Sequence, residues 1–297
     1  MNILIAGGSG FLGSALTKSF VSDGHKVFIL TRGIKKFQNA ETIQWDAKTT
    51  NGWGQRIHEM DVVIHLTGKS LSTFPWTSAT KKSFLDSRLL PGFALASAIQ
   101  ASSKRPSIFI QASGINYYGL HGSLADESTP PADDFLAQLA VKWEDATRLL
   151  DDLGVRRIIT RSAVVLDKKG SLLDLMSLPI KLFFGGALGS GKQAMPWIHI
   201  QDWVGAIRYL IANENARGAY NLIAPAQTSN VEFNKTIAQV IHRPYWFRTP
   251  EFLLRNILGE MSVLILDGRF SQPKRLIESG YTFQFPSLLE ALESLMN

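Results

Sequence analysis

Residues 1–16 read MNILIAGGSGFLGSAL, and this stretch decides the fold of the chain. An apolar run at 3–6 is followed by Gly7, Gly10 and Gly13, and then by an apolar segment typical of a helix. In a strand–turn–helix unit the first glycine permits the tight turn and the second lets the backbone approach a diphosphate, while the third lets helix pack on strand. The helix N-terminus then offers free N–H groups to the anion. The alternative is a glycine turn that binds nothing. The stretch predicts a dinucleotide cradle with contacts from Gly7, Ser9, Gly10, Phe11, Leu12 and Gly13.

The first half of the chain alternates apolar strand-like runs with longer helix-like segments. Strands are predicted at 27–30, 43–45, 61–66, 107–112 and 157–160, and helices at 11–22, 78–101 and 134–152. This alternation is typical of a doubly wound parallel sheet, which is a Rossmann-type α/β fold. After about residue 165 the rhythm stops and a glycine-rich loop at 185–191 follows. We therefore predict a dinucleotide-binding domain over 1–165, to which a helix near 202–213 returns. Residues 166–197 and 216–297 are predicted to form a smaller α+β substrate lobe.

Composition restricts the class of protein. The 297 residues are 45% apolar and 19% charged, with no cysteine and a net charge of +6. The basic residues come in scattered pairs without aromatic residues between them, which argues against a nucleic-acid partner. The sequence contains no run of about 18 uncharged apolar residues that would indicate a membrane span, and no signal peptide is evident. No cluster of side chains has metal-ligand spacing. We predict a cytoplasmic protein with no membrane partner and no metal, whose oligomeric state stays open.

The end of the second predicted strand indicates which dinucleotide binds. The sequence there is Leu30-Thr31-Arg32-Gly33, without the carboxylate that accepts hydrogen bonds from the ribose of NAD. A guanidinium can grip a phosphate through two hydrogen bonds. Lys35 and Lys36 follow within reach. The alternative is that Arg32 is a solvated loop residue. We predict that Thr31 and Arg32 contact the cofactor and that NADP(H) is preferred over NAD(H).

Further motifs recur in a fixed order along the chain. They are Asp46, His65-Leu66-Thr67-Gly68, Ser87-Arg88, Ala112-Ser113-Gly114-Ile115-Asn116-Tyr117-Tyr118-Gly119, Asp134-Phe135-Leu136, Trp143-Glu144, Gly185-Gly186-x-x-Gly189-Ser190-Gly191, Trp197-Ile198-His199-Ile200-Gln201-Asp202, Leu258-Gly259-Glu260-Met261 and Pro273-Lys274-Arg275-Leu276. Together with the glycine turn, this set resembles the "epimerase family protein" subgroup of atypical extended short-chain dehydrogenases/reductases. Members of that subgroup are labelled NAD-dependent sugar-nucleotide epimerases or cell-division inhibitors. The resemblance covers nearly the whole chain and implies cofactor contacts from Leu66, Thr67, Gly68 and Ser87.

One departure from the wider superfamily concerns its catalytic pair. The superfamily carries Tyr-x-x-x-Lys on a helix, a spacing that puts both side chains on one face and lets the ammonium lower the phenol's pKa. None of the six tyrosines here has a lysine four residues later. Aligned on Trp143-Glu144, the two positions hold Leu136 and Ala140, neither of which can move a proton. Ordinary alcohol–ketone chemistry is therefore in doubt.

Other polar residues near the predicted cleft can replace the lost pair. Tyr118, and after it Tyr117, are predicted as proton donors because they follow the fifth strand, at the edge where ligands bind in such sheets. Ser113 is predicted to assist them by hydrogen bonding. Both tyrosines can instead be packing residues, and Ser113 a strand-end cap. Lys69, Arg88 and His199 are predicted to meet an anionic substrate, although His199 suits a structural hydrogen bond and Arg88 can pair with Asp86 or Glu144.

Two functional hypotheses follow from these residues. The first is an NADP(H)-dependent oxidoreductase or sugar-nucleotide epimerase acting on a small anionic metabolite. The second is a non-catalytic NADPH-binding sensor or regulatory scaffold. The roofed cleft implied by the glycine-rich loop and the substrate lobe favours the enzyme. The lost pair favours the sensor. One fold hosts many functions, and the substrate and the reaction direction stay open.

Overall fold

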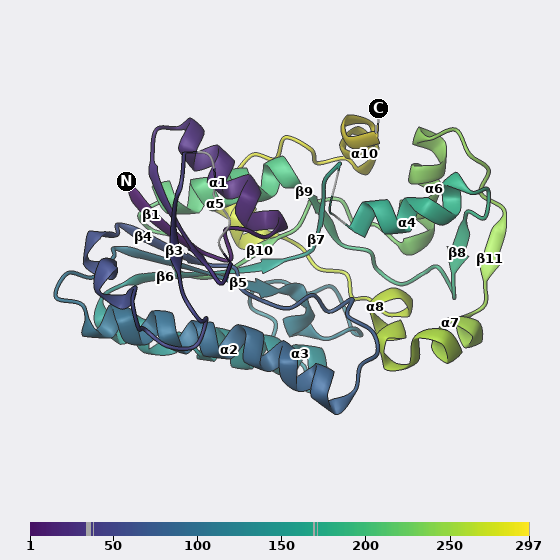
Figure 1. The fold of residues 1–297 in the computed structure, drawn as a ribbon. Coiled ribbons are helices and arrows are strands. Elements are labelled where there is room, and N and C mark those ends of the chain that lie inside the picture. Colours follow the sequence, from purple (N-terminus) through teal and green to yellow (C-terminus); the bar gives the residue numbers. More distant parts are fainter. Residues whose placement is uncertain (34–36, 38, 169, 171, 297) are drawn as a thin grey trace.

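The computed structural model describes residues 1–297 except 34–36, 38, 169, 171 and 297. Its centre is a seven-stranded sheet in the order β10-β6-β5-β4-β1-β2-β3, and all neighbouring strands run parallel (Figure 1). The strands are β1 (Asn2–Ala6), β2 (Lys26–Thr31), β3 (Glu41–Gln44), β4 (Val62–His65), β5 (Ile108–Gly114), β6 (Arg156–Ser162) and β10 (Gly218–Leu222). The predicted doubly wound Rossmann sheet is confirmed.

Both faces of the sheet are covered, because successive side chains of a strand point to opposite faces. Ile3 and Ile5 of β1 pack with α1 (Phe11–Ser22) and α5 (Ile200–Ala212). Leu4 and Ala6 face the other way and pack with α2 (Ser78–Ala101) and η3 (Arg148–Leu153). α3 (Phe135–Asp145) lies beside α2, and Figure 1 shows this pair on one side of the sheet with α1 and α5 on the other.

A smaller lobe surrounds a third apolar core. This core joins α4 (Leu172–Lys181), α6 (Asn230–Val240) and α10 (Leu288–Met296). Two small parallel sheets border it, one of β7 (Val164–Leu166) with β9 (Trp197–His199) and one of β8 (Gly186–Leu188) with β11 (Phe247–Thr249). The remaining elements are η1 (Gly54–Glu59), η2 (Ile115–Tyr118), α7 (Glu251–Leu258), η4 (Gly259–Ser262), α8 (Val263–Leu266) and α9 (Lys274–Glu278).

One strand lies elsewhere than predicted. We placed residues 216–297 wholly in the smaller lobe, but β10 pairs in parallel with β6 and is an edge strand of the main sheet. Its Tyr220 and Leu222 belong to the core beneath α1 and α5, and Leu276 of α9 joins them. The reason is that α5 carries the chain back across the sheet, so the next strand meets the open edge of β6. The division into two domains otherwise stays a prediction.

Candidate functional site

The glycine turn lies between β1 and α1, at the carboxyl edge of the sheet. Gly7 has a φ of +88°, which favours glycine, and a Cβ built at Gly13 would lie 2.3 Å from the Gly7 carbonyl oxygen. A Cβ at Gly10 meets only that same oxygen, at 3.3 Å. Gly10 is also the N-cap of α1 and supplies no side-chain cap. The turn is therefore tight on its inner side and leaves the first N–H groups of α1 without a side-chain partner.

A groove of about 710 Å³ runs along this turn and across the ends of the neighbouring strands. Predicted cofactor residues that line it are Gly7, Ser9, Gly10, Thr31, Arg32, Leu66, Thr67, Gly68 and Ser87. Phe11, Leu12 and Gly13 do not line it. Gly13 is buried against the turn, and the other two pack on the core beneath α1. Lys35 and Lys36 lie outside the described residues.

The predictions also missed part of this groove. Its further lining residues are Leu30, Trp45, Asp46, Ala47, Lys48, Ser83, Asp86, Leu90 and Pro91. Asp46 follows β3 and accepts backbone hydrogen bonds from Lys48 and Thr49 at 2.8 Å each, which lower its pKa. The sequence held a signal for these residues, because parallel strands β1, β2 and β3 bring the residues that follow each of them to the same edge of the sheet.

The end of β2 carries a cation that lines the groove. The Thr31 hydroxyl accepts the Gly33 N–H at 3.3 Å. The Arg32 side chain is exposed and makes no ion pair or hydrogen bond with another described residue. The carboxylates that line the same groove are engaged, since Asp86 pairs with Lys82 at 2.6 Å and Asp46 binds its own loop. A phosphate at this place would meet a free guanidinium.

A second hollow, of about 480 Å³, opens between the sheet and the smaller lobe. Its walls include Leu136, Leu139, Ala140 and Trp143 of α3 and, from the lobe, Leu172, Leu175, Met195, Met261, Leu264 and Ile265. We call it the apolar cavity. The two positions of the lost catalytic pair, Leu136 and Ala140, therefore lie on its wall. The groove and the apolar cavity meet at Gly68, where a built Cβ would come within 3.1 Å of the Arg88 guanidinium carbon.

Arg88 is buried at this junction, with 7% of its surface exposed. Its Nη1 donates to the Phe84 carbonyl at 3.0 Å, and its guanidinium lies 4.8 Å from the centre of the Trp143 ring. Burial lowers its pKa to about 10, so it remains a cation at neutral pH. The expected alternative partners are taken, because Asp86 pairs with Lys82 and Glu144 with Arg161. No carboxylate among the described residues pairs with Arg88.

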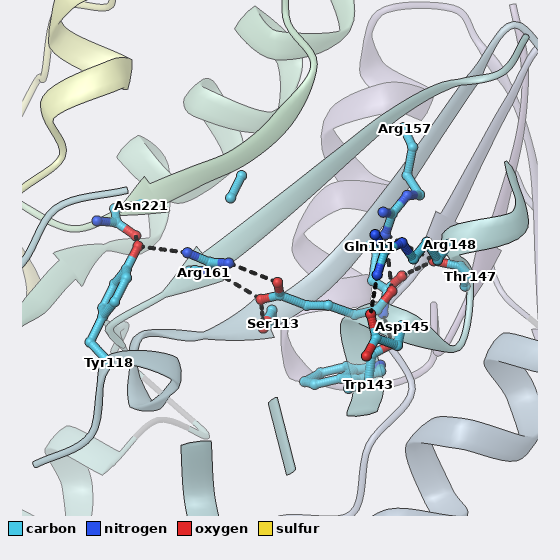
Figure 2. A network of polar contacts seen from close by, with 12 residues as sticks. Gln111, Ser113, Tyr118, Trp143, Asp145, Thr147, Arg148, Arg157, Arg161 and Asn221 are labelled. Carbon is cyan, nitrogen blue, oxygen red and sulfur yellow. Dashed lines mark hydrogen bonds and ion pairs between the residues drawn. The ribbon is translucent and has the colours of Figure 1, made fainter. Parts of the chain in front are cut away.

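Ser113 lines the apolar cavity from the end of β5 and begins a buried chain of polar contacts (Figure 2). Its hydroxyl donates to Glu144 at 2.7 Å. Arg161 binds both oxygens of Glu144, at 2.9 and 2.8 Å. Arg161 also donates to the Tyr118 hydroxyl at 3.0 Å, and that hydroxyl donates to Asn221 at 2.7 Å. The Ser113 proton is thus directed to a carboxylate, which leaves the oxygen lone pairs to accept from a ligand.

This network contradicts the prediction that Tyr118 donates a proton to substrate. Tyr118 has no exposed surface and does not line the apolar cavity or the groove. Burial raises the pKa of its phenol to about 12, although the neighbouring Arg161 acts in the opposite direction. Tyr117 lines neither hollow, and its ring centre lies 3.4 Å from the Arg161 guanidinium carbon. Both tyrosines stabilise a buried arginine instead.

The three predicted substrate residues do not come together. His199 is 1% exposed and caps α5, with its Nδ1 accepting the Gln201 N–H at 3.1 Å. Its ring also lies 3.8 Å from that of Phe285. The prediction that it meets substrate was therefore wrong. Lys69 lines the groove and not the apolar cavity, and it donates to Ser83 at 3.0 Å. Arg88 alone of the three lines the apolar cavity.

Within the described ranges, no group of three or more His, Asp or Glu side chains is placed to hold a metal ion. No helix among these residues is long and apolar enough to cross a membrane.

Comparison with known proteins extends these observations. Residues 3–138 match the NAD dependent epimerase/dehydratase family, and residues 249–295 match a domain of unknown function, DUF1731. The chain is 38% identical to the epimerase family protein YfhF of Bacillus subtilis, covering 100% of this chain and 98% of that one. The chain belongs to the epimerase family proteins. The resemblance drawn from its motifs is confirmed.

Solved structures of similar proteins fall into two groups. This epimerase family protein is 30% identical to human epimerase family protein SDR39U1 (isoform 2), solved with NADPH, and the TM-score is 0.88 over 99% of both chains. It also matches UDP-glucose 4-epimerase from Thermotoga maritima with a TM-score of 0.80 over 99% of this chain and 96% of that one, at 16% identity. The second likeness concerns the fold alone.

Proposed function

We propose that this protein binds NADP(H) in the groove and acts as an oxidoreductase or epimerase on a small anionic substrate in the apolar cavity. The glycine turn fits a dinucleotide, because a side chain is excluded at Gly13 while the outer side of Gly10 is open. The human relative was solved with NADPH. Arg32 and Thr31 at the end of β2 supply a cation and a hydroxyl where a carboxylate would favour NAD.

The residues that line the groove would hold the cofactor, and those that line the apolar cavity would hold the substrate. When bound, NADP(H) would supply or accept a hydride. The turn and the start of α1 would hold its diphosphate, and Arg32 its additional phosphate. Arg88 would pair with the substrate's negative charge, and Ser113 would accept a hydrogen bond from the substrate. Glu144 and Arg161 would fix the direction of the Ser113 hydroxyl.

The observation that carries this proposal is the position of Arg88. A buried guanidinium with no carboxylate partner costs free energy, because its desolvation is not repaid by an opposite charge. It lies where the groove and the apolar cavity meet, packed against Gly68. An anion bound there would offset that cost and would lie beside the cofactor. This arrangement is expected of a site that holds substrate next to a dinucleotide.

The cofactor assignment is tested by replacing Arg32. Arg32→Ala removes a charge-assisted contact, so NADPH affinity should fall about ten- to a hundredfold while NADH affinity changes little. Titration calorimetry with both dinucleotides measures this. Arg148→Ala, an exposed arginine beyond the groove, is the matched control and should leave both affinities unchanged. Equal binding of NADH and NADPH by the unmutated protein would contradict the preference.

A non-catalytic NADPH-binding role is the second candidate. It is favoured by the apolar residues Leu136 and Ala140 on the cavity wall and by the burial of Tyr118. The two functions differ in turnover. An enzyme should oxidise NADPH, or form an epimerised product, with some member of a panel of carbonyl acids and nucleotide sugars. Tight NADPH binding without turnover across the whole panel would favour the sensor.

A further inference from the structure

We propose that the apolar cavity takes an amphipathic anion, with one acidic head group at Arg88 and an apolar body along α3 and the smaller lobe. A nucleotide sugar is the poorer ligand. This inference rests on the proposed function, since it takes the cavity to be the substrate site beside NADP(H). It goes further by stating the chemical class of the substrate, which the family name alone would place among sugar nucleotides.

The walls of the cavity carry the first part of the argument. From α3 it is lined by two leucines, an alanine and a tryptophan, and from the lobe by leucine, isoleucine and methionine side chains. The polar lining residues Ser70, Ser72, Ser113, Asn116 and Ser162 come from the side of the cavity formed by the strand ends. A sugar or nucleotide that extended onto the apolar walls would leave hydroxyl groups without partners, which costs free energy. An alkyl or aromatic body gains free energy from the same contact.

The mouth of the cavity continues this apolar lining. Leu172 and Leu175 of α4 line the cavity and are 38% and 63% exposed. Leu178 and Leu182, farther along the same segment, are also more than one-third exposed. A tail too long for the cavity would therefore pass over an apolar surface of the lobe. At the entrance of a site for a polar ligand, exposed leucine side chains would make no favourable contact with that ligand.

The charges of the cavity argue for a single head group. Its charged lining residues are Arg88, Arg269 and Asp267. Arg269 is held by the carbonyls of Ser123 and Tyr118, at 2.7 and 2.6 Å, and Asp267 faces His121 and Arg255. Only Arg88 is without a carboxylate or a second carbonyl partner among the described residues. One free cation matches one carboxylate or phosphate better than a diphosphate.

A neighbouring donor adds to this head-group site. The indole Nε1 of Trp143 is buried and has no hydrogen-bond partner within the described part of the chain. Trp143 lines the cavity directly beneath the Arg88 guanidinium. This N–H has almost no accessible surface, so a ligand oxygen would accept from it only if the indole turned toward the cavity on binding.

The ligand class is tested by calorimetry on the full chain loaded with NADP⁺. Butanoate, hexanoate and octanoate probe the apolar body, and each added methylene should raise affinity roughly fourfold. Octanamide has the same body without the charge and should bind roughly ten- to a hundredfold more weakly than octanoate. UDP-glucose should bind more weakly than octanoate. A flat chain-length series, equal binding of octanamide, or tighter binding of UDP-glucose would each overturn the inference.

Two variants locate the ligand. Leu175→Gln should make affinity less dependent on chain length, whereas Ile277→Gln is the control, because Ile277 is exposed on α9 and does not line the cavity. Arg88→Met should weaken octanoate to the level of octanamide. If Ile277→Gln alters the series as much as Leu175→Gln, the ligand lies outside the cavity and the inference fails.

The same preparations separate this inference from the proposed function. NADPH binding is measured on each variant first, and it also reports that the variant is folded. If NADPH does not bind the unmutated protein while octanoate binds through Arg88 and Leu175, the cofactor assignment fails and the ligand class stands. If NADPH binds and the carboxylates do not, the ligand class fails and the cofactor assignment stands.

Discussion

Tyr118 shows how one residue changes its role between sequence and structure. In sequence it follows a strand at the ligand edge of the sheet, where a phenol can act as an acid. In the structure its hydroxyl lies between Arg161 and Asn221, and Asn221 is 103 residues away in the chain. The hydroxyl satisfies two buried polar groups at once. Its contribution is therefore to stability and to the orientation of Arg161, and through Arg161 to Glu144 and Ser113.

The first prediction concerns that hydroxyl. Tyr118→Phe leaves the Asn221 oxygen and an Arg161 N–H without a partner, so it should cost about 1–3 kcal/mol of unfolding free energy. Urea denaturation measures this, and NADPH affinity should be nearly unchanged. Tyr117→Phe is the control, because the Tyr117 hydroxyl makes no hydrogen bond with another described residue. Equal losses of unfolding free energy in the two variants would show that the hydrogen bonds of the Tyr118 hydroxyl do not stabilise the fold.

A second prediction at this scale concerns His65. It is fully buried at the end of β4, with Nε2 2.6 Å from the Thr67 hydroxyl, and burial together with Arg88 lowers its pKa to about 3. The folded protein therefore keeps it neutral, while the unfolded chain protonates it near pH 6.5. Stability should fall as the pH drops below about 6.5 towards 3, because the unfolded state binds the extra proton.

The size of this effect can be isolated by substitution. The slope from one such histidine is at most about 1.4 kcal/mol per pH unit. His65→Gln removes the titrating group, so its urea-unfolding free energy should fall less between about pH 7 and 5 than that of the unmutated protein. Burial also lowers the pKa of His199, and its contribution is common to both proteins. Parallel pH profiles would show that His65 does not titrate as described.

At the scale of elements, the glycine turn and α1 form one unit with two separate requirements. The inner side must be free of side chains so that α1 can approach β1. The outer side must be open so that a diphosphate can approach the turn. Gly13 meets the first requirement, and Gly10 meets the second. Gly10 caps α1 and Gly13 lies three residues later in its first turn, so the two glycines serve different sides of the same turn.

Substitutions at the two glycines should fail in different ways. Gly10→Val adds a branched side chain on the ligand side, so the protein should fold and lose NADPH binding. Gly13→Ala places a methyl group 2.3 Å from the Gly7 carbonyl oxygen, so it should lower stability before it affects binding. Thermal unfolding and NADPH titration of both variants distinguish the two effects. Unchanged NADPH affinity in Gly10→Val would mean that the turn is not the cradle.

Helix α3 shows what periodicity can predict. Residues four apart share a helical face, and Leu136 and Ala140 do lie together on the wall of the apolar cavity. The predicted length of this helix was less accurate. The expected helix over 134–152 divides into α3 and η3, and the side chain of Thr147 between them donates to Gln111 of β5. A tertiary hydrogen bond ends the helix where the local sequence does not.

At the scale of the whole molecule, the C-terminal segment holds the two parts together. α9 packs on β10 of the main sheet, and α10 packs on α6 of the lobe. Between them, the fully buried Asp202 of α5 accepts hydrogen bonds from the N–H groups of Gln284 and Phe285, at 2.7 and 2.8 Å. One carboxylate on the returning helix therefore fixes the path of the tail across both parts.

The last prediction tests that attachment. Asp202→Ala leaves two backbone N–H groups without their acceptor, so it should cost about 1.5–3 kcal/mol of stability. The tail beyond residue 279 should become the first site of cleavage in limited proteolysis. Asp202→Asn keeps one acceptor oxygen, so its stability should lie between that of the alanine variant and that of the unmutated protein. If the tail of the alanine variant is cut no faster than that of the unmutated protein, other contacts hold it.

Sequence alone determined the features that depend on local chemistry. The dinucleotide turn, the parallel strands beside it and the basic end of β2 follow from glycine geometry, apolar runs and the type of a single residue. Tertiary structure alone decided the roles of His199, Tyr118 and β10. His199 became a helix cap, Tyr118 a partner of Asn221, and β10 an edge strand. Each role depends on burial and on partners far away in the chain, and neither burial nor a distant partner is encoded in the residues next to it.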